Sequence, residues 1–340
     1  MANDKLFKKL CKPETMKIGW YLAQDDSRDD FVRDPVSHAD YASNLAARLE
    51  YLIEQLQCNR YQPKQLIEVD VPKSDLSVRP GNVLPIEEAS VLHAIIYLLA
   101  PILNDALDSA VYSYRLRKDW KKKAKRGQSL FREVPISVPF LKRRTIRSIS
   151  PFIAWYEQWP AFDIDTKKAV DQEGYTHLTK TDVSSYFENI DLRLLHDLIK
   201  SLLKKEEKRT LQLLFRILSS WTRTSVAGVP LNRGIPQGND VSSFLGNIYL
   251  IPLDRILINF CKKYGAKWFR YVDDVKVYTR SEKHAREAVF VINKALRDIH
   301  LNLQGSKTEI LSGESLRQEH DSSKLDVVND WNEPLNLDKG

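Results

Sequence analysis

The chain has 340 residues, of which 43% are hydrophobic and 29% are charged, and its formal net charge is +7. This composition excludes an intrinsically disordered chain, and the length exceeds one ordinary domain and allows a sizeable core. The modest positive charge favours a polyanionic partner without requiring one.

The cysteines and the N-terminal sequence indicate the cellular compartment in which the protein is expected. Cys11, Cys58 and Cys261 are scattered and match neither a zinc-ligand spacing nor a disulfide framework. No signal-peptide pattern begins the chain, and the apolar stretch 89–100 is too short for a membrane span and predicts a buried helix. We therefore expect a cytoplasmic protein in a reducing environment, without a membrane partner.

The first half of the chain predicts helices followed by basic segments. Residues 37–58 carry leucines at helical spacing, and residues 86–109 predict a second helix interrupted by Pro101. Basic runs with aromatic neighbours follow at 115–126 and 142–147. Such a mixture suits phosphates and unpaired bases, although a solvated basic face has the same composition. Residues 163–174 are polar and predict an exposed connection.

A strand is predicted at 175–182, because polar and apolar residues alternate up to Asp182. Asp191 is placed to cap the next helix, whose apolar residues recur at helical spacing. Asp182 would thus lie at a strand end, where its carboxylate is available to a neighbouring element. Helices are predicted at 191–202, 205–221, 240–260 and 283–299.

The segment Gly234-Ile-Pro-Gln237-Gly238 predicts a loop whose backbone approaches another group closely, since neither glycine has a side chain to prevent it. Asp240 or Ser242 would start the following helix, and Pro252 would end or kink it.

Two adjacent carboxylates, Asp273 and Asp274, lie between strand-like flanks in residues 268–278. The pattern predicts a hairpin with the aspartates at its tip. Two like charges at a turn repel each other, and a divalent cation such as Mg²⁺ would neutralise them. An isolated pair of this kind is more often a solvated turn. Together with Asp182, however, the pair would form a site for two metal ions that catalyse phosphoryl transfer.

In this order the segments resemble the palm motifs of reverse transcriptases. Asp182 matches motif A, Pro236-Gln237-Gly238 matches motif B, Tyr271-Val-Asp-Asp274 matches motif C, and the segment around Lys307 resembles motif D. The segments 71–80 and 85–87 resemble the fingers motifs, so the likeness covers roughly residues 70–312. The resemblance implies an RNA-directed DNA polymerase, which is a nucleotidyltransferase.

The resemblance implies roles for the residues that would bind metal. Asp182, Asp273 and Asp274 would bind two Mg²⁺ ions, with Mn²⁺ as an alternative, and the carbonyl of Val183 would be a backbone ligand. No nucleophilic side chain is needed, because the primer's 3′-hydroxyl attacks and the protein positions groups and supplies charge.

The resemblance also implies substrate-binding residues. Lys73 and Arg79 would grip the triphosphate, although a solvated basic loop is the alternative. Phe187 would lie under the sugar and exclude a 2′-hydroxyl, and Gln237 would contact the template or the nascent base pair. Lys307 would give a proton to pyrophosphate. A core role for Phe187 and a surface role for Lys307 stay open.

The predicted elements are those of an α+β fold. By the resemblance, it is a right-hand polymerase of fingers and palm, with an antiparallel palm sheet packed by helices and a thumb that is short or missing. The regions expected are 1–65 as an N-terminal helical region, 66–174 as fingers with a basic insert, 175–312 as a palm carrying motifs A to D, and 313–340 as a polar C-terminal tail or the start of a thumb.

Within the family, the stretch Tyr112-Ser-Tyr-Arg115, the long insert before motif A and the pattern in 244–254 look most like the bacterial defence-associated and abortive-infection (Abi-type, unknown-group) reverse transcriptases. This likeness implies anti-phage defence. The partners expected are an RNA template, which in such enzymes is often a dedicated non-coding RNA, a DNA product, deoxynucleoside triphosphates, and a second copy of the chain or a partner protein. The alternatives are a retron-like or group II intron-derived enzyme without a defence role, and a nucleic-acid-binding subunit that needs a partner for activity.

Overall fold

A computed structural model describes residues 4–28, 34–72, 78–118, 120, 132–136, 144–222, 229 and 231–320. The chain divides into two compact units, each assembled from separate stretches of sequence. Unit 1 comprises Met1–Asp108, Tyr114–Ala154 and Ser185–Ile251, and unit 2 comprises Ser109–Ser113, Trp155–Ser184 and Pro252–Gly340. The four consecutive regions expected from the sequence remain a prediction.

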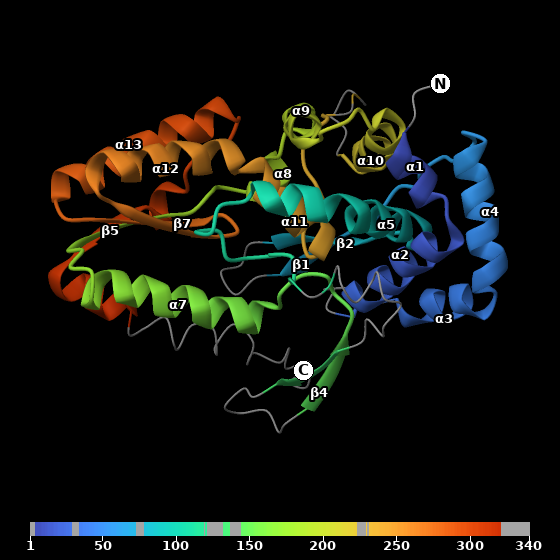
Figure 1. Ribbon diagram of the computed structural model, residues 1–340, viewed down its shortest axis with the longest axis horizontal. Helices are drawn as coiled ribbons and strands as arrows, with labels where there is room; N and C mark the ends of the chain where they lie inside the picture. Colours follow the sequence, from blue (N-terminus) through green and yellow to red (C-terminus); the bar gives the residue numbers. More distant parts are fainter. Residues whose placement is uncertain are drawn as a thin grey trace. The chain divides into compact units, whose positions relative to one another are not determined.

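Unit 1 is mainly helical and is built around α5 (Ile86–Leu103), which is buried on most sides. The other helices of this unit are α1 (Lys5–Leu10), α2 (Pro13–Asp26), α3 (Pro35–Ser43), α4 (Leu45–Gln57), α8 (Tyr186–Asn189), α9 (Leu192–Leu202), α10 (Lys208–Ser220) and α11 (Asp240–Tyr249) (Figure 1). By length and composition the stretch Ile86–Ala106 could cross a membrane, but 67% of its apolar window is buried inside the protein.

The contact between α2 and α5 explains a glycine. A Cβ atom at Gly19 would lie 2.3 Å from the carbonyl oxygen of Ser90 and 2.6 Å from the Cβ of Ala94. No side chain fits at that separation, so glycine lets the two helix backbones approach each other closely.

Several predicted helices have different bounds in the structure. The helix expected at 37–58 is two helices, α3 and α4, because the chain leaves the helical conformation at Asn44. Pro101 lies inside α5 without interrupting it. The helix expected at 240–260 is also two, α11 and α12 (Ile251–Tyr264). Pro252 therefore occupies the first turn of α12, where the missing N–H has no helical partner to lose.

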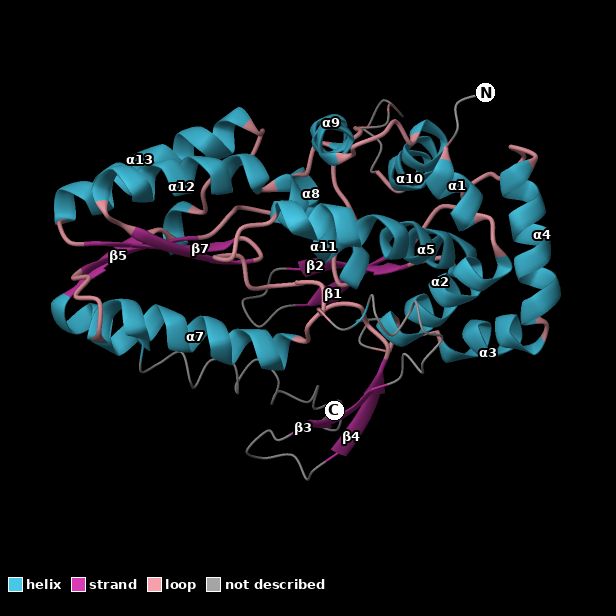
Figure 2. Ribbon diagram, in the orientation of Figure 1, coloured by secondary structure: helices cyan, strands magenta, loops and turns pink. Residues whose placement is uncertain are grey.

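Unit 1 also contains two antiparallel ribbons (Figure 2). One joins β1 (Ile67–Pro72) to β2 (Val78–Val83), and the other joins β3 (Arg132–Ile136) to β4 (Arg144–Ser148). Much of the two basic runs lies outside the described residues. Of the described part, Arg115 donates to the carbonyl of Asp108 at 2.5 Å and Arg117 donates to the carbonyl of Phe152 at 2.8 Å, so both arginines hold neighbouring backbone.

Unit 2 contains a four-stranded antiparallel sheet in the order β6-β7-β5-β8. Its strands are β5 (His177–Thr181), β6 (Lys267–Tyr271), β7 (Asp274–Thr279) and β8 (Glu309–Ser312). The helices α12 and α13 (Glu282–Asp298) cover one face of the sheet and α7 (Trp155–Asp171) covers the other (Figure 1). An apolar cluster that includes Phe162, Phe269 and Tyr278 fills the space between α7 and the sheet. This arrangement confirms the α+β fold and the antiparallel sheet packed by helices.

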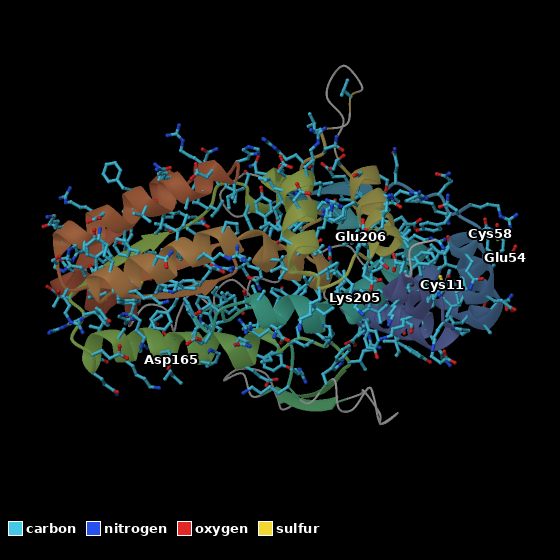
Figure 3. The ribbon with its side chains drawn as sticks, turned by 45° about the horizontal axis from the view of Figure 1, so that its top comes forward. Cys11, Glu54, Cys58, Asp165, Lys205 and Glu206 are labelled. Carbon is cyan, nitrogen blue, oxygen red and sulfur yellow. The ribbon has the colours of Figure 1, made fainter. Side chains whose placement is uncertain are left out.

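The exposed connection predicted at 163–174 is wrong. Helix α7 continues to Asp171, and its side chains Phe162, Thr166 and Ala169 are buried at helical spacing. The charged residues that suggested a loop lie between these positions, and Asp165 is one of them (Figure 3). Its carboxylate accepts a hydrogen bond from the hydroxyl of Tyr112 at 2.6 Å. The small and apolar residues on one face of α7 were too few, among so many charged residues, to predict a helix from the sequence.

The end of the described chain and the cysteines complete the fold. Residues 313–320 are helical, and Leu316 from this segment is 2% exposed and belongs to the apolar cluster of unit 2. Cys11 and Cys58, at the ends of α1 and α4, are free thiols (Figure 3). Cys261 is also a free thiol.

Candidate active site

The predicted hairpin is confirmed, but only Asp273 of the two aspartates lies in its turn, because Asp274 is the first residue of β7. Tyr271 in β6 pairs directly with Asp274 in β7, which leaves Val272 and Asp273 as a two-residue turn. Val272 has a φ of +54°, a conformation that a β-branched residue rarely adopts. Its N–H donates to the hydroxyl of Ser113 and its carbonyl accepts from the guanidinium of Arg270, both at 2.8 Å. The two hydrogen bonds hold the strained turn that presents Asp273.

Arg270 also forms a buried ion pair. Its side chain is fully buried and donates two hydrogen bonds, of 2.8 and 2.6 Å, to the carboxylate of Asp254 in α12. The forked guanidinium suits a carboxylate in this way. Asp254 therefore positions Arg270, and Arg270 in turn positions the turn with Asp273. Asp254 is the last residue of the 244–254 pattern, and its sequence context did not indicate this positioning role.

Replacement of Asp254 with alanine is expected to destabilise the protein by about 3–5 kcal/mol, because a buried guanidinium loses its partner. Urea denaturation of the purified variant measures this loss. Glu282→Ala is the matched control, since Glu282 pairs with Arg286 on the surface and an exposed pair contributes only about 0–1 kcal/mol. Equal effects of the two substitutions would contradict a positioning role for Asp254.

Asp182 lies one residue beyond β5, as predicted. One of its carboxylate oxygens accepts from the N–H of Val183 at 3.0 Å, and the other lies 2.8 Å from the ammonium of Lys307. The backbone of 182–184 pairs with 302–304 through bonds of 2.8 and 2.9 Å. Val183 and Leu303 thus form a non-hydrogen-bonded antiparallel pair, so the Val183 carbonyl points away from Leu303. Its orientation leaves it available as a backbone ligand.

The three aspartates are gathered in unit 2. Burial raises the pKa of Asp273 well above its usual range, as do the charge of Asp274 and the charge and hydrogen bond of Asp182. Burial and the charge of Asp182 also raise the pKa of Asp274 to about 6, against the opposing effect of three nearby lysines. The carboxylates are forced together at a cost that a divalent cation would offset.

The donor set fits hard divalent cations, because it consists of carboxylate oxygens and an available carbonyl. Within the described ranges, however, no three acidic, histidine or cysteine side chains are placed to hold one metal ion in this arrangement, and this includes the three aspartates. Lys307 and the direct Asp182–Asp273 contact occupy the carboxylates in this arrangement.

Two lysines of the palm sheet are neighbours of the aspartates. Lys180 in β5 and Lys276 in β7 are direct cross-strand partners. Lys180 is two residues before Asp182 and Lys276 is two residues after Asp274, a spacing that places side chains on the same face of a strand. Glu319 lies 2.9 Å from the ammonium of Lys180 and 3.2 Å from that of Lys276, which offsets the repulsion between the two cations. Sequence reasoning missed this triad, although the spacing of two residues could have indicated both lysines.

Lys307 lies next to the aspartates, as its assignment required. Its hydrogen bond with Asp182 raises the pKa of its ammonium group, and the other two aspartates act in the same direction. The side chain is 67% exposed, so it is accessible to a substrate as well. A protonated amine at this position is a proton donor that also partly neutralises the acidic cluster.

Phe187 and Gln237 belong to unit 1 and lie in adjacent segments. The carbonyl of Phe187, in α8, accepts from the N–H of Ile235 at 3.0 Å, and the carbonyl of Ile190 accepts from Gly234 at 2.8 Å. These bonds join the loop that carries Gln237 to the segment that carries Phe187. Gly234 and Gly238 have φ values of +93° and +108°, so the loop requires glycine at both positions.

A buried polar network supports the same loop in unit 1. The N–H of Asp240, the first residue of α11, donates to Asp26 at 3.1 Å, and Asp26 lies 3.0 Å from His93. The carboxylate of Asp240 accepts from the hydroxyl of Ser150 at 2.7 Å. Burial, followed by the charge of Asp26, raises the pKa of Asp240 to about 7. No pattern in the sequence indicated that Asp26 and His93 would meet the start of α11.

The structure describes little of the two predicted triphosphate ligands. Lys73 lies outside the described residues. The backbone of Arg79 is in β2, opposite Val71 in β1, and its side chain lies outside the described part of the chain.

An antiparallel sheet with three carboxylates and a lysine at one end is the arrangement of a nucleotidyltransferase that works through bound metal. Residues 108–330 match the family model described as "Reverse transcriptase (RNA-dependent DNA polymerase)". This match covers well over half of the chain, and the protein therefore belongs to the reverse transcriptase family.

Similar solved structures include telomerases. The telomerase of Candida albicans, in complex with a fragment of telomeric RNA, is 12% identical with a TM-score of 0.49, over 76% of this chain and 44% of that chain. The apo telomerase of Candida tropicalis, truncated from its C-terminal domain, is 12% identical with a TM-score of 0.46, over 74% and 50% of the two chains. This chain thus spans half or less of those structures. No curated protein matches the sequence.

Proposed function

We propose that the protein copies RNA into DNA by adding deoxynucleotides to a primer, with two Mg²⁺ ions, or Mn²⁺ as an alternative, in its active site. The observation that carries the proposal is the cluster of Asp182, Asp273 and Asp274, in which burial and the neighbouring carboxylates raise the pKa of Asp273 and of Asp274. The family match supports the polymerase chemistry.

The chain's own residues position the reaction. The three carboxylates and the Val183 carbonyl would hold the metal, which when bound activates the primer hydroxyl and stabilises the leaving pyrophosphate. Lys307 holds a proton at its ammonium group, 2.8 Å from Asp182, and would deliver it to pyrophosphate. Arg270 and Ser113 keep the turn with Asp273 in place while nucleotides bind and leave.

The test is DNA synthesis by the purified protein with the nucleic acid that accompanies it from cells. Incorporation of labelled deoxynucleotides that requires Mg²⁺ and is lost after ribonuclease treatment supports RNA-directed synthesis. Incorporation that survives ribonuclease treatment would show a template other than RNA. Bound RNA without any incorporation would indicate a binding subunit that needs a partner.

Phe187 is proposed as the residue that excludes ribonucleotides. Its half-buried ring lies near Gly246, where an added Cβ would be 3.5 Å from the ring and 3.2 Å from the ring of Tyr186. Gly246 therefore leaves space beside α11 for both rings, whose planes are tilted by 56° to each other. A ring held in this position would clash with the 2′-hydroxyl of a ribonucleotide.

Replacement of Phe187 with alanine is expected to raise the use of ribonucleotides relative to deoxynucleotides by at least about tenfold, since one steric contact is worth about 1–3 kcal/mol in discrimination. The ratio of the two kcat/KM values measures the effect. Phe215→Ala, which removes a half-buried ring in α10 that contacts His196, is the control. Sugar selectivity that does not change would refute the assignment.

We further propose a role in anti-phage defence in the bacterial cytoplasm, with a dedicated RNA and a second copy or partner protein. The support is the likeness of 112–115 and 244–254 to defence-associated enzymes and the scattered free cysteines. Ser113, from the first of these segments, holds the turn with Asp273. Phage plaque counts on cells that express the protein test this role. Protection that is absent, or independent of Asp273, would favour a retron-like or intron-derived enzyme.

A further inference from the structure

The outer face of α13 has a composition that the stability of the helix does not explain. Its inner face consists of small and aliphatic residues, among them Ala285, Ala288 and Ile292, which are buried against the sheet of unit 2. The hydroxyl of Thr179 in β5 donates to the carbonyl of Ala285 at 2.9 Å. One face of α13 is thus buried in the core of unit 2, and the opposite face is exposed to solvent.

Five residues follow one another along this outer face at intervals of three or four positions. They are Lys283, Arg286, Phe290, Lys294 and Arg297. With a rise of about 1.5 Å per residue, this row is about 21 Å long. We name it the α13 stripe. It contains four cations with an aromatic ring at its centre.

Most residues of the α13 stripe do not stabilise the helix that carries them. Phe290 is 78% exposed, the highest value among the large hydrophobic side chains that the structure describes as exposed. Lys283 lies in the first turn of α13, where a cation opposes the helix dipole. Within residues 282–298, Lys283, Lys294 and Arg297 form no ion pair with a described carboxylate. Only Arg286 does so, with Glu282, and both side chains of that pair are more than half exposed.

The stripe also borders a cavity. A volume of about 400 Å³ lies between α13 and β8, lined by Glu282, Arg286 and Val289 on the helix and by His177, Thr308 and Glu309 on the sheet side. Its lining offers hydrogen-bond donors and acceptors together. Such a lining suits a nucleoside, whose base and ribose also carry both, better than it suits a bare phosphate.

We propose that the α13 stripe and the adjoining cavity bind a single-stranded segment of RNA outside the polymerase site. The cations of the stripe contact successive phosphates, and Phe290 provides a face on which one base stacks. A duplex would not fit this role, because its bases are already stacked and paired. RNA is the polymer that the family's reaction requires, and the carboxylates at the cavity can accept hydrogen bonds from its 2′-hydroxyls. In that respect the inference rests on the proposed function, although the stripe includes no catalytic residue.

The proposal is tested by the binding of a fluorescent, unstructured single-stranded RNA to the full chain whose polymerase site is already occupied by a short primer–template duplex. Phe290→Ala is expected to weaken binding at least about fivefold, through the loss of one stacked base. The triple variant Lys283→Ala, Lys294→Ala, Arg297→Ala is expected to reduce the slope of log Kd against log salt by about 2, at about 0.7 for each lost phosphate contact.

The control variant Lys5→Ala, Lys9→Ala, Lys12→Ala removes the same charge from exposed positions of unit 1. DNA synthesis on the short duplex is measured in parallel, so that failure of the polymerase and failure of the stripe are seen separately. The proposal is overturned if the control and the α13 variant lose the same affinity, or if Phe290→Ala binds RNA as tightly as the unchanged protein. Equal binding of single-stranded DNA overturns the assignment to RNA, and ultraviolet cross-links confined to other surfaces overturn the site.

Discussion

Replacement of both Asp273 and Asp274 with alanine is expected to reduce DNA synthesis by more than about a thousandfold. Loss of a residue that merely supports a metal ligand already lowers metal affinity or activity about 10–100-fold, and these two aspartates are proposed as ligands themselves. Primer extension with labelled deoxynucleotides, over a range of Mg²⁺ concentrations, measures the loss. An excess of metal should not restore synthesis, because two of three carboxylates are gone.

The same variant should remain folded, and its thermal midpoint without divalent ions should not fall. Burial and mutual repulsion raise the pKa of both carboxyls in the folded protein, so removing them relieves an unfavourable interaction. Asp171→Ala with Asp298→Ala, which removes two exposed carboxylates of unit 2, is the matched control and should retain full synthesis. Synthesis that persists in the Asp273/Asp274 variant would show that this cluster is not the active site.

The stability of the protein without divalent ions is expected to decrease as the pH rises from about 4 to about 7. The pKa of Asp274 is about 6 in the folded protein and 3.8 in its ordinary state, and burial and the neighbouring carboxylates also raise the pKa of Asp273. Between these values the folded protein binds more protons than the unfolded chain, so each step up in pH costs stability. Below the ordinary pKa the difference is constant and the contribution is fully present.

Mg²⁺ should reverse this trend, since it binds the ionised carboxylates of the folded protein and replaces the protons. The thermal midpoint should therefore rise on addition of Mg²⁺ at pH 8 and change much less at pH 5. Asp273→Asn with Asp274→Asn should remove both the Mg²⁺ response and this part of the pH dependence. A Mg²⁺ response that is the same at both pH values, or that the double asparagine variant retains, would mean that the ion binds elsewhere.

Much of the site could be predicted because its parts are local patterns. The alternation before Asp182, the β-branched flanks of Asp273 and Asp274, and the capping position of Asp191 each depend on a few neighbouring residues. The structure confirms these elements: β5 ends one residue before Asp182, the hairpin closes between Tyr271 and Asp274, and Asp191 accepts hydrogen bonds from the first turn of α9. The order of such patterns along the chain indicated the family.

Predictions failed where a long-range contact overrode a local pattern. Residues 163–171 are rich in charge and were expected to form a connection, yet Phe162 and Ala169 are buried in the core of unit 2 and make this segment part of α7. Asn44 divides a helix that leucine spacing predicted as continuous. For α7 the burial of a few side chains against distant partners decided the structure, and local preference is too weak to oppose it.

The sequence by itself determined the strands that lead to the three aspartates, the hairpin that contains Asp273 and Asp274, and the class of chemistry that carboxylates at such strand ends can perform. The tertiary structure alone decided which side chains shift the pKa values of the aspartates and which side chains hold the aspartates in position. Glu319 reaches Lys180 across 139 positions, and Arg270 reaches Asp254 inside the core. The reason is physical. The spacing of apolar residues along the chain indicates which side of a helix or strand is buried, whereas the pairing of charges depends on which buried sides contact each other in the fold.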